Sequence, residues 1–202
     1  FVIIISVGAV AAVLYSRGYL AHCLAEKSPA HISLHYTALV AMFYAMLGVV
    51  LSDGGFSFLF FWELMTVASF LLILFDAQRR EVRRAALSYL IMMHIGFVLL
   101  VIGFVRLDAA CGAATFGALG DYFRTQPGLP LLLVFLAGFG MKAGLFPMHV
   151  WLPEAHPAAP SHVSALMSGV MIKTGVYGIL RVTAALGEQP LLHTAGVILL
   201  AA

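Results

Sequence analysis

Three ionisable side chains lie in the middle of long apolar runs. They are Glu63 in FSFLFFWELMTVASF, Lys142 in VFLAGFGMKAGLF and Lys173 in SALMSGVMIKTGVYG. A charge at the centre of a membrane-spanning helix costs about 2.5–3.5 kcal/mol on insertion scales. Buried ion pairs that only specify helix packing are one explanation, but apolar residues would usually stabilise such a bundle better. We therefore interpret these residues as candidates for a proton or ion path.

The segment after Lys142 combines histidines with prolines. FPMHVWLPEAHPAAPSH carries prolines at 147, 153, 157 and 160 among histidines at 149, 156 and 162. Pro147 removes one backbone hydrogen bond and should kink or break the helix there. Broken helices at membrane depth are tolerated where they are buried in protein or line a water-filled cavity. We predict a discontinuous helix beside a hydrated path, in which His149 relays protons.

The histidines are open to other interpretations. His149 and His162 are thirteen residues apart, but the prolines between them exclude a continuous haem-binding helix. A zinc site of His149, His156 and His162 has suitable ligand types without a recognised spacing. His94, alone in SYLIMMHIGFVLL, fits either an internally hydrogen-bonded core histidine or a relay. We expect neither a cofactor nor a metal ion in this chain.

Helical spacing predicts which of these side chains share a face. His162, Gly169 and Lys173 are at i, i+7 and i+11, which fall within roughly 20° of one another on a 3.6-residue period. They should form one stripe if the helix already begins at His162. Glu63 and Thr66, at i and i+3, should share a face of their own helix.

Long apolar runs must position these side chains. The 202 residues are 62% apolar and 10% charged with a mean hydropathy of +1.02, whereas soluble domains are about 45–50% apolar and about 25% charged. This composition excludes a water-soluble globule, and the net charge of +2 gives no reason to expect nucleic-acid binding. Runs near the ~20 residues that cross a bilayer cover 36–52, 56–75, 85–105, 129–150 and 163–180.

Two further runs are cut by the chain ends. Residues 1–20 should end a sixth span, and residues from 191 onward should start a seventh. The connection 106–128, rich in glycine and alanine, is expected to be a surface excursion. We predict an all-α, polytopic transmembrane helix bundle and interpret the chain as a fragment of a longer protein.

Basic residues predict the orientation of the bundle. The connection 76–84, DAQRREVRR, holds four arginines, and arginine in short loops resists translocation. Because successive spans cross the membrane in alternate directions, Arg17 and Lys27 should lie on the same side of the membrane as residues 76–84. We therefore predict that residues 76–84 are cytoplasmic in a prokaryotic inner membrane, with the arginines serving topology and lipid headgroup contact or docking a partner.

Three segments resemble a known family. They are FWELM, RRAALSYLIMMHIGF and GFGMKAGLFPMHVWLPEAHPAAPSHVSALMSGVMIKTGVYGILR. They resemble the antiporter-type membrane subunits of NADH:quinone oxidoreductase and of Mrp cation/proton antiporters. The last segment is most similar to the large membrane subunit (component B) of formate hydrogenlyase and hydrogenase-4.

The resemblance implies a fold of fourteen or more helices with two inverted five-helix repeats. Residues 1–35 would then hold the end of a preceding helix and a cytoplasmic loop. Residues 36–182 would form the first repeat, including its broken helix, and residues 183–202 a loop and the start of the next helix. The second repeat, with its terminal acid or lysine, is absent from this sequence.

The resemblance also implies roles for individual residues. Glu63 matches the family's glutamate on the second helix of the repeat, and Lys142 matches the lysine on its broken fourth helix. Lys173 matches the lysine on the fifth helix, and His149 lies at a polar position after the break. Apart from the resemblance, His94 and His162 are candidate relay positions because of their residue type.

The electrostatics of such a pair can be stated in general terms. A lysine in low-dielectric surroundings holds its proton less tightly, and a nearby carboxylate restores that hold. At an effective dielectric near 20, a unit charge about 8 Å away contributes roughly 2 kcal/mol. Neutralising Glu63 would then release a proton from Lys142 toward Lys173, through His149 or water.

The function implied is proton translocation within a redox-driven membrane complex of the hydrogenase-4 or NADH:quinone oxidoreductase type. The chain would have no active site of its own, and iron–sulfur, nickel–iron or flavin groups would belong to peripheral redox subunits. Other membrane subunits and the lipid bilayer would be its remaining partners, and sodium is the alternative ion. An Mrp-type sodium/proton antiporter subunit and a quinone-binding redox subunit are the alternative functions.

The predicted orientation can be tested with the two cysteines, because Cys23 and Cys111 lie in connections on opposite sides. In intact cells, a membrane-impermeant thiol reagent should label Cys111 in a Cys23→Ser background and should spare Cys23 in a Cys111→Ser background. Labelling of Cys23 alone would invert the topology.

Overall fold

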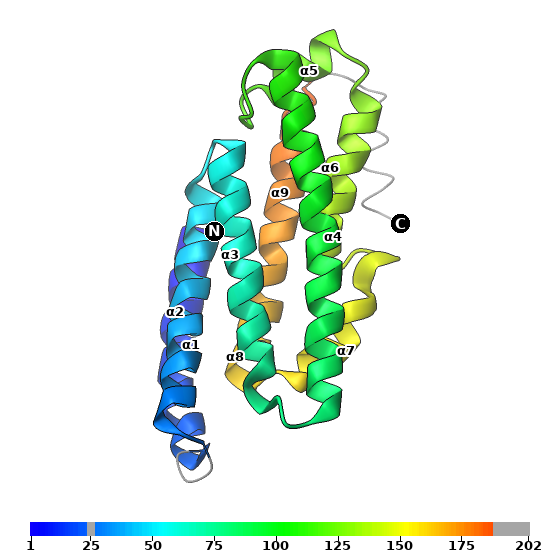
Figure 1. The fold of residues 1–202 in the computed structure, drawn as a ribbon. Coiled ribbons are helices and arrows are strands. Elements are labelled where there is room, and N and C mark those ends of the chain that lie inside the picture. The colour runs from blue at the N-terminus through cyan, green and yellow to red at the C-terminus, as the bar shows by residue number, and fades with distance from the viewer. Residues whose placement is uncertain (24–26, 188–202) are drawn as a thin grey trace.

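The computed structural model describes residues 1–23 and 27–187, which form long helices lying side by side (Figure 1). The helices are α1 (Val2–Cys23), α2 (Pro29–Leu51), α3 (Gly55–Ile73), η1 (Leu74–Asp76), α4 (Arg80–Cys111), α5 (Leu119–Thr125), α6 (Gly128–Ala143), η2 (Met148–Trp151), α7 (Leu152–Ala158), α8 (Ser161–Leu166), η3 (Met167–Met171) and α9 (Ile172–Ala184). The only β-contact in this part of the chain is an isolated bridge between Gly54 and Thr115. The prediction of an all-α bundle is confirmed.

Six helical segments are long and apolar enough to cross a membrane. They are Val2–Ala21, Pro29–Leu51, Gly55–Asp76, Arg80–Cys111, Gly128–Ala158 and Ser161–Ala184. Each of the six predicted runs up to residue 180 corresponds to one of these segments. The seventh, from residue 191 onward, lies outside the described residues.

The observed helices extend beyond several of the predicted runs. Helix α2 begins at Pro29 instead of residue 36, because the side chain of Ser28 caps it by accepting a hydrogen bond from the His31 amide at 3.3 Å. Helix α4 continues to Cys111, where Gly112 with φ 69° ends it. Polar residues lie at the start of α2 and at the end of α4, so apolar runs alone predicted shorter helices.

The connection 106–128 differs from the expected surface excursion. Its first part continues α4 as a helix, and its second part forms the short helix α5. Leu119, Tyr122 and Phe123 of α5 are buried. These apolar side chains, spaced three and four residues apart, fold the connection back against the end of the bundle.

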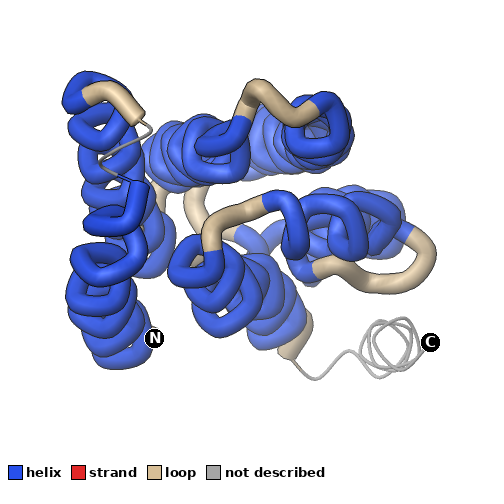
Figure 2. The backbone as a smooth tube through the Cα atoms, turned by 90° about the horizontal axis from the view of Figure 1, so that it is seen from below, coloured by secondary structure: helices blue, strands red, loops and turns tan. Residues whose placement is uncertain are grey.

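The helices are arranged around a shared interior (Figure 2). Helix α3 packs against α2 and α4, and α6 packs against α4 and α9, while α1 lies outside against α2 and α8. Aromatic side chains fill the centre in edge-to-face and stacked contacts. They are Phe58, Trp62, Phe104, Phe116, Phe135 and Phe139.

Polar contacts fasten the connections at the two ends of the bundle. At one end Lys27 forms an ion pair with Asp76 at 2.7 Å, which joins the α1–α2 connection to the α3–α4 connection. These two connections therefore lie at the same end, as the alternation of spans predicted (Figure 1). At the other end Arg181 pairs with Asp53 at 2.7 Å and donates to the Ser52 carbonyl at 2.7 Å.

Close approach of α9 to α6 depends on glycine. A Cβ added at Gly175 would lie 2.6 Å from the amide nitrogen of Ala143 and 2.8 Å from the carbonyl oxygen of Phe139. Backbone atoms cannot rotate away as a side chain can, so any larger residue at 175 must push the two helices apart. Small residues allow such close helix contacts in membranes.

We expect Gly175→Ala to lower the thermal unfolding temperature of the purified full-length protein. Overpacking of this kind costs about 1–3 kcal/mol. Gly169→Ala is the matched control, because an added Cβ at Gly169 has no neighbour within 4 Å. Equal unfolding temperatures for the two variants would contradict the proposed close contact of α9 with α6.

Candidate functional site

Lys142 lies in the last turn of α6 and is enclosed by the protein. Its side chain is 1% exposed. The Nζ atom donates a hydrogen bond to Oγ1 of Thr66 at 2.7 Å and lies 4.9 Å from the centre of the Trp62 ring. The Thr66 hydroxyl donates in turn to the Trp62 carbonyl at 3.1 Å, which leaves its lone pairs free to accept from Lys142. One hydroxyl and one aromatic face thus replace the hydration of the lysine head group.

The helix that carries Lys142 ends one residue later. Gly144 takes a left-handed conformation with φ 68°, and its amide donates to the Gly140 carbonyl. The indole nitrogen of Trp151, in η2, donates to the Met141 carbonyl at 2.9 Å. The predicted break is therefore present, but it begins at Gly144, three residues before Pro147.

Further hydroxyl groups are buried on the same side of α3. Ser69, one turn after Thr66, contacts the Tyr89 hydroxyl of α4 at 2.5 Å. The Tyr89 hydroxyl also points toward the sulfur of Met171 at 3.6 Å. Thr66, Ser69 and Tyr89 are each 0% exposed. They form a buried polar row that extends from Lys142 between α3 and α4.

Glu63 pairs with His94 instead of Lys142. The Glu63 Oε1 atom lies 3.0 Å from Nε2 of His94, while its Oε2 atom is buried without a hydrogen-bond partner in the described structure. No ion pair within 4.0 Å joins Glu63 to Lys142 among the described residues, although their charges interact across the helix interface. Thr66, on the same helix as Glu63, lies between them in sequence and takes the contact with Lys142.

Each ring nitrogen of His94 lies within hydrogen-bond distance of an oxygen atom. Its Nδ1 atom lies 3.0 Å from the Leu90 carbonyl and its Nε2 atom 3.0 Å from the Glu63 carboxylate, so both ring nitrogens face oxygen atoms. A neutral imidazole can donate from only one nitrogen. The contact can accommodate one proton shared between the Glu63 carboxylate and the His94 ring. It joins α3 to α4, and the His94 side chain is 48% exposed.

The predicted stripe of His162, Gly169 and Lys173 is wrong. His162 is 3% exposed and therefore buried, whereas Gly169 and Lys173 are exposed. The π-helical turn η3 (Met167–Met171) lies between them and adds about one residue to the turn, which rotates the following positions by roughly 100°. Lys173 thus faces away from the interior, where no hydrogen bond or ion pair of the described residues reaches it.

The remaining predicted relay residue does not contact Lys142. His149 is exposed, and its ring lies 5.8 Å from that of Phe146. His156 interacts with Ser164 at 3.0 Å, and His162 interacts with His35 at 2.8 Å. Within residues 1–23 and 27–187, no three histidine, cysteine or acidic side chains gather as a metal site.

Sequence reasoning missed Ser69, Tyr89 and His35. A tyrosine in a membrane-length apolar run needs a partner for its hydroxyl, and Ser69 lies three residues after Thr66 on the same helical face. These two signals could have identified the buried row. The partner of His35 lies 127 residues away in sequence, so spacing alone gives no signal for that contact.

Comparisons with known proteins cover most of the chain. Residues 52–201 match the family described as NADH:quinone oxidoreductase/Mrp antiporter, transmembrane. The chain is 44% identical over 155 residues to the uncharacterized protein Rv0083 of Mycobacterium tuberculosis, covering 75% of this chain and 24% of that protein. It is 38% identical over 186 residues to hydrogenase-4 component B of Escherichia coli, covering 90% of this chain and 26% of that protein.

Solved structures give the same result. The chain superposes on a subunit of the archaeal membrane-bound sulfane sulfur reductase with a TM-score of 0.75 at 30% identity, covering 92% of this chain and 29% of that chain. For the Mrp complex from Dietzia the TM-score is 0.72 at 26% identity, and the match covers 81% of this chain and 18% of that chain. The chain therefore spans about a quarter of the length of the curated relatives.

Loss of the Thr66 hydroxyl should affect Lys142 directly. Thr66→Val keeps the shape of the side chain but removes the acceptor of the Lys142 hydrogen bond. Leaving a buried polar group unsatisfied costs about 1–3 kcal/mol, and more for a charged group. We expect Thr66→Val to lower the unfolding temperature of the full-length protein, whereas Thr66→Ser, which keeps the hydroxyl, should remain close to wild type. Equal loss in both variants would assign the effect to packing instead of the hydrogen bond.

Proposed function

Because the chain belongs to the NADH:quinone oxidoreductase/Mrp antiporter family, we propose that it translocates protons as a membrane subunit of a redox-driven complex, with Lys142 as the proton carrier. The observation that supports this most directly is the enclosure of Lys142, 1% exposed, at the end of a broken helix. An ionisable group inside a membrane protein is expensive and marks a functional path by default. A single hydroxyl partner lets the amine hold or release its proton without losing that hydrogen bond.

Glu63 and His94 would control the proton on Lys142 through their combined charge. While the pair holds its shared proton, its net charge is zero, and after losing that proton its net charge is −1. A negative charge near Lys142 stabilises the ammonium form, and its neutralisation removes that stabilisation. A proton arriving at Glu63–His94 would therefore favour departure of the proton from Lys142.

Lys173 would accept protons beyond the described bundle. It lies on the exposed side of α9 in an apolar span, where an ammonium group needs a polar partner. The matched segments make up only 24% and 26% of two relatives, so further helices of a complete protein of that size are available to supply one. His149 would serve the path only through water or residues from such helices.

The complex would supply the energy. Hydrogenase-4 component B is named as one component of a larger enzyme, and other relatives are named as putative antiporter subunits. We propose that redox groups belong to partner subunits and that this chain contributes only the ion path. An Mrp-type antiporter is the second candidate, since relatives at 32% and 33% identity are named putative antiporter subunits and the Mrp complex from Dietzia has a similar fold.

Substitutions that remove a charge but keep the side-chain volume test whether Lys142 carries the proton. Glu63→Gln and Lys142→Met should each preserve assembly of the full-length complex and sharply reduce the ions moved per turnover in sealed vesicles. Lys27→Met, at a lysine near the bundle end that pairs with Asp76, is the control and should pump normally.

The double variant separates a carrier from a packing pair. Glu63 and Lys142 make no direct ion pair, but their charges interact, so removing one charge leaves the other less compensated and removing both restores the balance. If Glu63 and Lys142 only stabilise packing, the double variant should recover abundance and pumping together. If Lys142 carries the proton, abundance alone can recover. Normal pumping by the Glu63→Gln, Lys142→Met double variant would refute the proposed function.

A further inference from the structure

Two histidines far apart in sequence form a buried pair between α2 and α8. His35 is 4% exposed and His162 is 3% exposed. Their Nε2 atoms are 2.8 Å apart, and their ring planes are inclined at 74°. The pair lies toward the end of the bundle where α2 and α8 begin, which is also the end that holds residues 76–84 (Figure 1).

The hydrogen bond between the two rings determines where each neutral ring carries its proton. A hydrogen bond between two Nε2 atoms needs a proton on one of them and a lone pair on the other. In a neutral pair, the ring that donates has a bare Nδ1, and the ring that accepts carries its proton on Nδ1. Both Nδ1 atoms are buried and have no hydrogen-bond partner in the described structure. One end of the pair is therefore ready to accept a proton and the other is ready to release one.

The groups around the pair are mostly aromatic. Tyr15 and Tyr19 of α1 face His162, with ring centres at 6.4 and 5.3 Å, and Phe75 of η1 packs on His35 at 4.9 Å. His31, one turn before His35, contacts the Phe75 carbonyl with its Nε2 atom at 2.9 Å. The nearest ion pair toward the bundle end is Lys27–Asp76, which closes the same corner.

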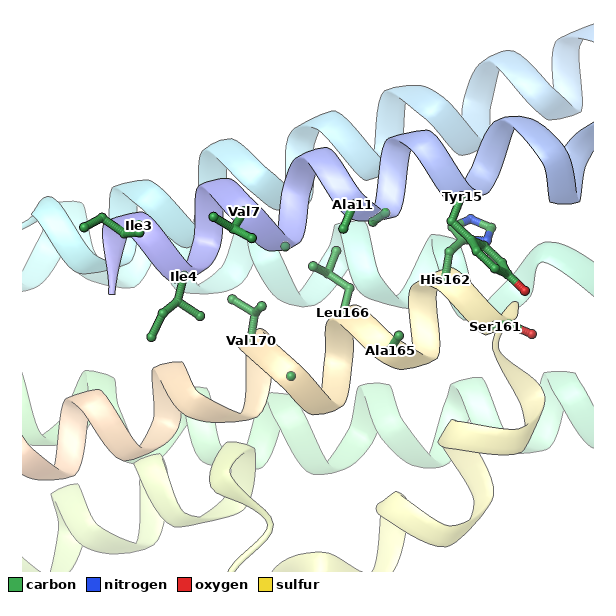
Figure 3. Close-up of a pocket in the computed structure, with 13 residues that line it drawn as sticks. Ile3, Ile4, Val7, Ala11, Tyr15, Ser161, His162, Ala165, Leu166 and Val170 are labelled. Atoms are coloured by element: carbon green, nitrogen blue, oxygen red, sulfur yellow. The ribbon is translucent and has the colours of Figure 1, made fainter.

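One side of the pair borders a cavity. A groove of about 780 Å³ runs between α1 and α8, and Figure 3 shows His162 with Tyr15 and Ser161 at one end of it. The rest of the lining is apolar, with Ile3, Val7 and Leu166 among its side chains. The polar groups of the groove thus gather where His162 lies.

We infer that His35 and His162 form a proton relay that connects the end of the bundle holding residues 76–84 with the interior of the protein. This inference rests on the proposed function and adds an uptake route to it. Because buried polar atoms are normally hydrogen-bonded, two buried Nδ1 atoms without a protein partner on one pair indicate exchange with water.

In one relay step, one proton enters the histidine pair and one proton leaves it. A proton from water binds the bare Nδ1 of the first ring, and the shared proton moves across the 2.8 Å contact to Nε2 of the second ring. The Nδ1 proton of the second ring then leaves to a water molecule on the far side. Two N–H bonds form and two break, the pair is neutral before and after, and both rings end in the opposite tautomer. The tautomers must return before the next proton passes in the same direction.

Glutamine substitutions test the relay in the full-length protein within its complex. In His35→Gln and His162→Gln the amide can still bond across the α2–α8 contact but cannot accept a proton at one end and release one at the other. A positioned proton-transfer group contributes roughly 10²–10⁴-fold, and other steps share control of turnover. We therefore expect pumping in sealed vesicles to fall about tenfold with assembly retained, whereas His31→Gln, one turn away, should pump normally.

The outcomes separate the relay from the proposed function. If both glutamine variants pump normally while Lys142→Met abolishes pumping, the relay is wrong and Lys142 keeps its role. If Lys142→Met also pumps normally, the relay falls together with the proposed function.

A spectroscopic measurement tests the pair independently of pumping. In ¹⁵N NMR spectra of the histidine-labelled full-length protein, the relay predicts opposite tautomers for His35 and His162 and a coupling between their Nε2 nuclei. The coupling should vanish in His162→Gln. Identical tautomers without coupling in the wild-type protein would overturn the inference.

Discussion

A lysine side chain that is 1% exposed inside an apolar bundle must obtain all its polar contacts from the protein. Thr66 supplies the hydrogen bond and Trp62 supplies the aromatic face. Both residues lie on α3, so the position of α3 relative to α6 decides whether Lys142 is stabilised. The aromatic centre of the bundle holds these two helices in place, because Phe139 of α6 packs edge-to-face on Trp62 at 5.4 Å.

The buried Lys142 lies next to the end of α6. An uninterrupted helix would satisfy its own carbonyl groups, whereas the left-handed Gly144 stops α6 one residue after Lys142. Trp151 then satisfies one of the free carbonyls from the segment that follows the break. The contact between Glu63 and His94 joins α3 to α4. Lys142 therefore lies at a helix end inside a membrane-length segment, and its hydrogen-bond partner Thr66 is on the same helix as Glu63.

The sequence was sufficient for the architecture but not for the contacts. The apolar runs predicted each membrane span up to residue 180. The helix predicted to break at Pro147 is interrupted, but the break begins at Gly144. The partner of Glu63 could not be predicted, because spacing within one helix does not determine which residue of a neighbouring helix it meets. The stripe containing Lys173 failed because a π-turn has no sequence signature in these residues and shifts every later position. His35 was missed since its partner belongs to a helix 127 residues away.

A proton carrier at Lys142 must change its protonation state during turnover. This can be measured by ¹⁵N NMR of the lysine-labelled full-length protein in sealed vesicles, with the Lys142 signal assigned by its loss in Lys142→Met. If Lys142 carries the proton, both ammonium and amine forms of its Nζ atom should be present, in a ratio that changes when the complex is energised. A single form that is identical in resting and energised vesicles would contradict it.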